Sequence, residues 1–528
     1  MPGKTARRMI ILASVAALAL AASGCAQSDR DEGDSSGGSS ASSKDTLVTY
    51  KPGTADLEPS LATEWTPNAD FTEWTFTLRE GVKFHDGTDF NADAVCFNFN
   101  RWYNFKGVLQ NPDVSAYWQD TFGGFAKNES PDLPESLFKS CTASNPTTVA
   151  IELSSATGRI PAALALPSFA MQSPAALQKY DADKVTASGD TFEYPSYATE
   201  HPTGTGPYKL DSRDEANKTV TIVRNDDYWG DKAKMGKIVF KVIPDNNARK
   251  QELQAGSIDG YDLVAPGDIE TLKSAGKQIL DRPPFNILYL GINQKNPALA
   301  KPQVRQALAH AVNREALVKS KFPPAAEVAK EFMPPEVAGY ADDVTTYSYD
   351  PAKAKQLLAE AGESNLALKF YWPTEVSRPY MPNPKEVYEV IASDLKKAGI
   401  KITPVAKVWN SGYLTDVNTG KADIHLLGWT GDYNDAYNFN GTFFGRVKPE
   451  FGFNNPAIFS AIAKADAIPD ATERADAYKA VNRQVMEFLP AVPISHSPPS
   501  LGTQSNVKDL FPSPVQNEEF SVVYTEGT

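Results

Sequence analysis

The chain has 528 residues, of which 41% are hydrophobic and 10% aromatic, and its formal net charge at pH 7 is −13. These values predict a globular protein of two or three domains, because one hydrophobic core does not extend over so long a chain. The acidic balance argues against a nucleic-acid-binding protein, whose contact surface would be basic.

The first 25 residues have the order of segments that is typical of an export signal. Two arginines and a lysine precede an apolar run that ends at Ala22, and small residues follow it. The run is too short for a comfortable transmembrane helix. The small residues before Cys25 resemble the processing site of bacterial lipoproteins, which implies that Cys25 is lipidated and becomes the mature N-terminus. An ordinary cleaved signal with an incidental cysteine is the alternative.

Residues 26–45 form a stretch of serine, glycine and aspartate that cannot bury enough apolar surface to fold. As a flexible coil, this stretch would have a reach of about 23 Å. We therefore expect a tether between a lipid anchor and a globular body. The protein would lie at the outer face of the cytoplasmic membrane, which is the periplasmic side where a second membrane is present.

Two further cysteines, Cys96 and Cys141, remain in the globular body. Export places the chain in a compartment that permits disulfides, so a Cys96–Cys141 bridge is one expectation. Two buried free thiols are the alternative.

The first half of the globular body is rich in strand signals. Residues 74–87 alternate between apolar and polar side chains and end in a turn, which predicts a strand. Residues 89–105 predict a helix with Asn91 as its N-cap. Residues 218–230 predict another strand, and residues 236–264 predict a strand, a helix and a strand in α/β order.

The second half alternates helices and strands. Residues 301–321 predict one amphipathic helix, and residues 349–363 predict a short helix with Asp350 as its cap. Residues 367–408 predict a βαβ unit, whose parallel strands would be covered by helices. Residues 470–490 predict a last long helix.

These patterns predict an α/β fold with two lobes, joined by extended crossings near Leu288 and Val492 that would act as hinges. The expected parts are lobe I at residues 46–285, with a β-rich subdomain at about 66–207, lobe II at 286–493, and a return to lobe I at 494–528.

No sequence pattern predicts catalysis. None of the five histidines lies at metal-ligand spacing to another, and the H-E-x-x-H, G-x-S-x-G and phosphate-loop patterns do not occur. Asp432 and Asn434 begin a calcium-loop pattern that then fails, because Tyr437 stands where glycine is needed and Phe443 where glutamate is needed. We therefore expect no enzyme, no metal and no cofactor. Paired carboxylates of a hydrolase need not be close in sequence, so a secreted hydrolase stays an alternative.

Five motifs stand in a fixed order along the chain. They are LEPSLATEWTPNADFTEWTFTLREGVKFHDGTDFNADAV from Leu57, GTGPYKL from Gly204, RNDDYWG from Arg224, QELQAGSIDGYDL from Gln251 and VRQALAHAVNRE from Val304. This set resembles the peptide/nickel family of extracellular solute-binding proteins, which serve ATP-binding-cassette importers, over nearly all of residues 46–528. The resemblance implies a class II clam like that of periplasmic binding proteins, with an extra subdomain in the first lobe.

Two more motifs, SRPYMPNP from Ser377 and GWTGDYND from Gly428, resemble the dipeptide-binding branch of that family. The resemblance implies that Arg378 receives the carboxylate of a bound peptide and that Asp432 receives its ammonium group. Arginine offers a planar fork of donors and aspartate offers only acceptors, which suits these roles. If the run stays extended, Arg378 and Tyr380 project to the same side. Trp429 could form a wall of the pocket.

Each of these residues also has a simpler interpretation. Asp432 could bond to nearby backbone amides, Arg378 could form a surface salt bridge, and Trp429 could be a core side chain. The chain also departs from the family pattern before residues 46–62, where a stretch of some tens of residues has no counterpart. That stretch usually forms part of the first lobe's sheet and one wall of the cleft, so we expect changed ligand contacts there and an uncovered sheet edge.

We therefore expect a lipid-anchored, monomeric binding protein that captures a short peptide, a dipeptide foremost, between its lobes. It would deliver the peptide to the membrane permease of an importer, and nucleic acid is not expected among its partners. One alternative is the same scaffold with another solute: a longer oligopeptide, a nickel chelate, an oligosaccharide or haem. Another is a surface interaction protein such as an adhesin.

Overall fold

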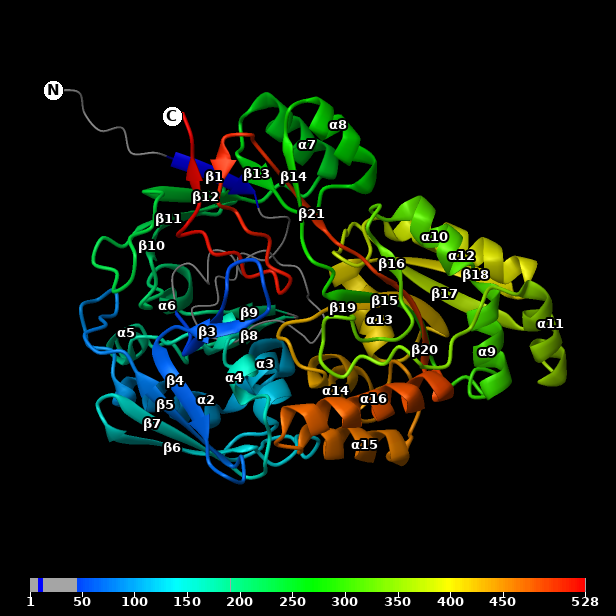
Figure 1. The fold of residues 1–528 in the computed structure, drawn as a ribbon, viewed down its shortest axis with the longest axis horizontal. Helices are drawn as coiled ribbons and strands as arrows, with labels where there is room; N and C mark the ends of the chain where they lie inside the picture. Colours follow the sequence, from blue (N-terminus) through cyan, green and yellow to red (C-terminus); the bar gives the residue numbers. More distant parts are fainter. Residues whose placement is uncertain (1–7, 13–44, 190, 528) are drawn as a thin grey trace. The chain divides into compact units, whose positions relative to one another are not determined.

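A computed structural model of the chain describes residues 8–12, 45–189 and 191–527 (Figure 1). These residues form two compact units. Unit 1 contains the described residues up to Val264 together with Asp268–Arg282 and residues 500–527, and unit 2 contains Ala265–Gly267 and Pro283–Pro499. Cys25 and most of the predicted tether lie outside the described residues. No helix that the structure describes is both long enough and apolar enough to cross a membrane.

Unit 1 contains a seven-stranded sheet to which distant parts of the chain contribute. In order across the sheet, its strands are β10 (Tyr208–Asp214), β11 (Thr219–Arg224), β12 (Lys237–Lys241), β1 (Arg8–Leu12), β13 (Gly260–Tyr261), β21 (Ser500–Thr503) and β14 (Gln278–Asp281). Strand β1 belongs to the predicted leader and pairs in parallel with β12 and β13. Processing at Cys25 would therefore remove β1 and leave β12 and β13 with unpaired edges.

The C-terminal segment of unit 1 is held by apolar and ionic contacts. Phe520 packs edge-on against Phe240 of β12, with 5.6 Å between the ring centroids. Arg282 is buried and contacts Asp262 at 3.0 Å and Glu518 at 2.6 Å. Burial of an arginine costs desolvation free energy, and its pairing with two carboxylates recovers part of that cost.

A second, antiparallel sheet in unit 1 has the order β4 (Ala62–Pro67), β5 (Glu73–Leu78), β7 (Thr148–Leu153) and β6 (Phe138–Asn145). The predicted strand at residues 74–87 ends early, at Leu78, because the chain turns at Gly81, whose φ is +73°. Helix α2 (Ala92–Tyr103) packs on β6 and β7. Asn91 accepts a hydrogen bond from the Ala94 amide, which confirms the predicted N-cap.

The other elements of unit 1 are short. The helices are α3 (Pro112–Phe122), α4 (Ile160–Ala163), α5 (Pro174–Lys179), α6 (Ser196–Thr199), α7 (Asn246–Ala255) and α8 (Ile269–Ser274). The strands are β2 (Val48–Tyr50), β3 (Leu57–Pro59), β8 (Thr186–Ser188), β9 (Thr191–Glu193), β22 (Val507–Lys508) and β23 (Tyr524–Thr525), paired two by two.

Unit 2 is built on a six-stranded sheet. In order across the sheet, its strands are β16 (Glu327–Val328), β20 (Ala491–His496), β15 (Asn286–Ile292), β19 (Ile424–Thr430), β17 (Ala367–Thr374) and β18 (Lys401–Val408). Strands β18, β17 and β19 run parallel, and β15 is antiparallel to β19. Every residue of β15, β19 and β20 is buried, as is typical of strands covered on both faces.

Helices cover both faces of this sheet (Figure 1). They are α9 (Pro302–Ala311), α10 (Arg314–Lys321), α11 (Pro351–Glu360), α12 (Pro384–Lys397), α13 (Leu414–Asn418), α14 (Tyr437–Phe444), α15 (Pro456–Asp466) and α16 (Ala471–Phe488). In Figure 1, α10 and α12 lie on one side of the strands and α14 to α16 on the other. The predicted βαβ unit, formed by β17, α12 and β18, and the Asp350 cap of α11 are both confirmed.

The single helix predicted at residues 301–321 is wrong in one respect. The chain leaves the helical conformation at Val312, and the structure has two helices, α9 and α10, instead of one. Asn313 caps the second helix, because its side chain accepts a hydrogen bond from the Ala316 amide. An asparagine that competes for backbone groups favours a helix start over a helix interior.

Candidate ligand-binding site

Three loops of unit 2 meet at the same edge of its sheet. Strand β18 ends just before Trp409, β17 leads into the loop that holds Arg378, and β19 leads into the loop that holds Asp432. Because these three strands are parallel neighbours, their carboxyl ends lie at one edge. In α/β sheets, this edge is where ligands bind.

Arg378 lies in a tight turn and stacks on an aromatic ring. Its backbone amide donates to the Met381 carbonyl at 3.1 Å, and the Met381 amide donates to the Arg378 carbonyl at 2.9 Å. The run is therefore not extended, so the expectation that Arg378 and Tyr380 share one side of a strand is wrong. The guanidinium carbon lies 4.3 Å from the centre of the Trp409 ring, and the residue is only 6% exposed. The stacking holds the guanidinium plane in place.

Trp409 contacts a residue of the candidate site, and the sequence did not reveal it. It follows directly after the carboxyl end of β18 and is buried. Its position after a predicted strand was the available signal. A tryptophan directly after a strand can equally well belong to the hydrophobic core. Only its contact with Arg378 links Trp409 to the candidate site.

Tyr380 brings the two predicted ligand-binding segments together. Its side chain is fully buried and packs against Gly428, the first residue of the G-W-T-G-D segment. A Cβ atom on Gly428 would come within 2.4 Å of Tyr380 Cδ2 and within 2.2 Å of the Ile287 carbonyl oxygen. Glycine is required here because any side chain would overlap these atoms.

Asp432 lies in the loop between β19 and α14 and is partly exposed. Its backbone amide donates to Asn438 Oδ1 at 2.8 Å, and its Oδ2 lies 3.5 Å from Asn438 Nδ2. At the end of the loop, Asp435 pairs with Arg474 at 3.1 Å and accepts a hydrogen bond from the Tyr437 amide. Asp435 is thus engaged in holding the loop, whereas Asp432 is the partly exposed acid.

Trp429 is 3% exposed, and its indole N–H donates to Asn438 Oδ1 at 3.1 Å. Its ring meets Phe443 of α14 edge-on, with 6.1 Å between the centroids. Since neighbouring residues of a strand point to opposite faces, Trp429 and Gly428 face away from each other across β19. A contact between Trp429 and ligand stays a prediction.

A buried histidine nearby has structural partners. His425 Nε2 lies 2.8 Å from Glu450 Oε1, and the Tyr289 hydroxyl donates to the same oxygen at 2.9 Å. At the end of β20 in the same sheet, His496 Nδ1 lies 2.6 Å from the Asn286 carbonyl oxygen, and burial lowers the pKa of His496 to about 4. This imidazole is therefore neutral at physiological pH.

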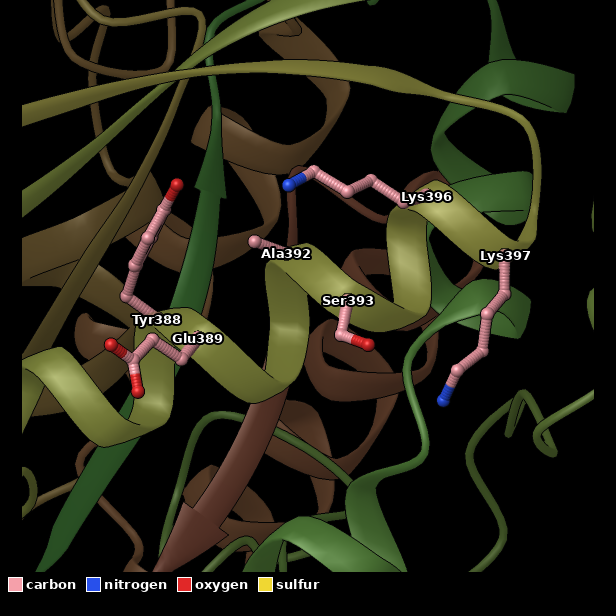
Figure 2. A pocket seen from close by; sticks show the side chains of 6 residues that line it. All are labelled: Tyr388, Glu389, Ala392, Ser393, Lys396 and Lys397. Carbon is pink, nitrogen blue, oxygen red and sulfur yellow. The ribbon is translucent and has the colours of Figure 1, made fainter.

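A shallow groove of about 500 Å³ lies on the surface of α12. Figure 2 shows Tyr388 and Lys396 on either side of Ala392, while Lys397 points the other way. All residues that line it come from this one helix: Tyr388, Glu389, Ala392, Ser393, Lys396 and Lys397. The groove contains none of the residues predicted to bind ligand, and it is not part of the candidate site.

The remaining predicted residues lie elsewhere. Cys96 in α2 and Cys141 in β6 form a disulfide in unit 1. The two cysteines lie 45 positions apart in the sequence. Cys25, the predicted lipidation site, lies outside the described residues. The described part of the chain shows no group of three or more His, Cys, Asp or Glu side chains placed to hold a metal ion.

The α/β architecture and the charged and aromatic loops at one strand edge define a ligand-binding protein of the two-lobed periplasmic-binding-protein class. The chain is 33% identical to the dipeptide-binding protein of Escherichia coli (strain K12) over 493 residues, 91% of this chain and 88% of that one. It is 31% identical to heme-binding protein A of Haemophilus influenzae over 507 residues, 94% of this chain and 89% of that one.

A solved structure also matches nearly the whole chain. The dipeptide binding protein from Pseudoalteromonas sp. SM9913, in complex with Met-Leu, matches with a TM-score of 0.81 at 24% identity, covering 98% of this chain and 100% of that one. The sequence pattern of the bacterial extracellular solute-binding proteins, family 5 Middle, matches residues 56–450. The chain belongs to this family, as its motifs predicted, and it is a solute-binding protein rather than an enzyme.

Proposed function

We propose that the protein captures short free peptides, dipeptides foremost, and delivers them to an ATP-binding-cassette importer. The observation that carries this proposal is the placement of Arg378 and Asp432 in the loops after two neighbouring parallel strands, with Tyr380 of one loop packed on Gly428 of the other strand. The 33% identity to the Escherichia coli dipeptide-binding protein supports it.

The paired charges match the two ends of a free peptide. An arginine fork binds a carboxylate with two parallel hydrogen bonds, and a carboxylate accepts all the hydrogen bonds that an ammonium group donates. Each further residue lengthens an extended peptide by about 3.3–3.6 Å. A fixed Arg378–Asp432 separation therefore selects by length, and a longer peptide must bend to reach both groups.

The membrane attachment is part of the proposal. Cys25 carries the lipid, and the monomeric protein meets the permease at the outer face of the cytoplasmic membrane. The tether is one residue shorter than the predicted 26–45 and spans 26–44, because Asp45 is buried and accepts hydrogen bonds from Thr205 and Trp229. Mass spectrometry of the N-terminal peptide tests this: the membrane-bound protein should begin at a lipid-modified Cys25, and a Cys25→Ala variant should be released from membranes. Gel filtration of that variant reports the oligomeric state.

Calorimetric titration with a free dipeptide, its N-acetyl form and its C-terminal amide tests the ligand. We expect each blocked form to bind more weakly by about 2–5 kcal/mol, because blocking leaves Arg378 or Asp432 without its partner when the bound peptide covers it. Asp432→Asn should abolish the preference over the N-acetyl form, and Arg378→Gln the preference over the amide. Glu389→Gln on α12, whose side chain is 58% exposed, is the control and should bind as the parent does.

Equal binding of all three forms would contradict the proposal. So would tight binding of haem, an oligosaccharide or a nickel chelate by a protein that ignores dipeptides. A preference for pentapeptides over dipeptides would keep the family role and remove the selection by length.

A further inference from the structure

Asn438 stands at the centre of the contacts that hold the Asp432 loop. It lies in the first turn of α14 and is 3% exposed. Its Oδ1 accepts two hydrogen bonds, one from Trp429 Nε1 at 3.1 Å and one from the Asp432 amide at 2.8 Å. Its own backbone amide donates to the Asp435 carbonyl at 3.1 Å. One side chain thus connects the end of strand β19, the loop and the helix.

The orientation of the Asn438 amide follows from its partners. An indole N–H and a backbone N–H can only donate, so the atom that both of them contact must be the oxygen. The amide nitrogen therefore faces Asp432, where it lies 3.5 Å from Oδ2. The side chain presents a neutral N–H group to a carboxylate, and not a second negative oxygen.

We propose that Asn438 is a positioning residue for the Asp432 carboxylate and that its neutral amide, by adding no like charge beside that carboxylate, leaves it as the acceptor for a cationic ligand group. The inference rests on the proposed function, in which Asp432 receives the ammonium group of a peptide. Asn438 does not touch the ligand in this scheme. It acts by fixing the loop backbone through Oδ1 and by placing a neutral group, and not a second carboxylate, beside Asp432.

An isosteric variant separates the two parts of this role. Asn438→Asp keeps an oxygen for the Trp429 and Asp432 donors, and it replaces the N–H group beside Asp432 with a second carboxylate oxygen. Two neighbouring carboxylates repel each other when both are negatively charged. The pair therefore takes up a proton at a higher pH than a single aspartate does. Binding of a cation expels that proton, and affinity should then rise with pH.

The experiment measures the affinity of purified full-length protein for a free dipeptide and for its N-acetyl form between pH 5 and 7. We expect a nearly flat profile in the parent and at least a tenfold rise with pH in Asn438→Asp, for the free dipeptide only. Asn438→Ala, which removes the acceptor, should lower affinity for the free dipeptide about tenfold and leave the N-acetyl form unchanged.

Asn440→Asp is the matched control. Asn440 is also buried in α14, but its Nδ2 donates to Asn482 Oδ1 at 2.9 Å. This variant should lose stability and keep the flat pH profile of the parent. Circular dichroism of each variant checks that it is folded.

Three results would overturn the inference: a flat profile in Asn438→Asp, the same rise in Asn440→Asp, or equal losses for both ligand forms in Asn438→Ala. The last result would show a merely structural residue. A parent protein that does not distinguish the free from the N-acetylated dipeptide would refute the proposed function itself. A parent that does distinguish them, with variants that behave like it, would refute only the role of Asn438.

Discussion

Replacing Gly428 with alanine should damage both the stability of unit 2 and its ligand site. The new Cβ would lie 2.2 Å from the Ile287 carbonyl oxygen and 2.4 Å from Tyr380 Cδ2. Displacing either neighbour would cost substantial free energy. Ile287 belongs to the backbone of β15, whose residues are all buried, and the Tyr380 ring is fully buried. Relief requires β15 to separate from β19, or Tyr380 to move together with the turn that holds Arg378.

Overpacking of a well-packed interior costs about 1–3 kcal/mol. The upper end applies here because one of the overlapping atoms is backbone. For a unit of this size, about 3 kcal/mol corresponds to a fall of roughly 6–12 °C in the melting temperature. Scanning calorimetry measures this fall. Titration with a free dipeptide should show at least a tenfold weaker affinity, since the Arg378 turn moves with Tyr380.

Two further variants sharpen this test. In Gly267→Ala the added Cβ meets no atom within 4 Å, so stability should stay within about 0.5 kcal/mol of the parent. In a Tyr380→Ala background, Gly428→Ala should cost less than it does alone, with a coupling of about 0.5–3 kcal/mol. A Gly428→Ala protein that melts and binds like the parent would show that Tyr380 and Gly428 are not packed together as described.

Three other predictions concern pH and redox state. Burial raises the pKa of Asp45 from 3.8 to about 6, so the stability of unit 1, to which Asp45 belongs, should fall by about 3 kcal/mol as the pH rises from about 4 to 6. Asp45→Asn should remove this slope in melting curves, and an unchanged slope would contradict the assignment. Burial lowers the pKa of His496 from 6.5 to about 4, so the stability of unit 2, to which His496 belongs, should fall as the pH drops through that range. His496→Asn, which keeps a donor for Asn286, should flatten that part of the curve. Finally, reduction of the Cys96–Cys141 bridge should cost unit 1 about 4 kcal/mol, given its span of 45 residues, and leave the melting of unit 2 unchanged.

Local sequence signals located many elements correctly. The N-cap roles of Asn91 and Asp350 were predictable, because a short polar side chain just before an apolar helical pattern accepts a hydrogen bond from an amide of the first helical turn. The βαβ unit at residues 367–408 was readable because its alternation of patterns is strong. The single helix at residues 301–321 was not correct, because an asparagine inside an apolar helical pattern can end one helix and start the next.

The candidate site was only partly readable. Motifs pointed to Arg378 and Asp432, but the turn that buries Tyr380 and closes on Met381 was not expected. Trp409 and Asn438 escaped notice, since their importance lies in the partners they meet and not in their own neighbourhood in the sequence. The sequence also did not predict that Arg8–Leu12 forms a strand between β12 and β13. An apolar run that is typical of a leader does not indicate which strands it will pair with.

The sequence by itself determined the class of the protein, the caps and periodicities of its helices and strands, and the two charged residues that its motifs single out. These features depend on interactions between residues a few positions apart, or on motifs that can be recognised in the sequence by their order. Only the tertiary structure decided that Arg378 and Asp432 follow adjacent parallel strands, that Tyr380 rests on Gly428, and that Asn438 holds the Asp432 loop. Strand order and side-chain contacts between segments tens of residues apart are settled by packing, and packing has no local signature in the chain.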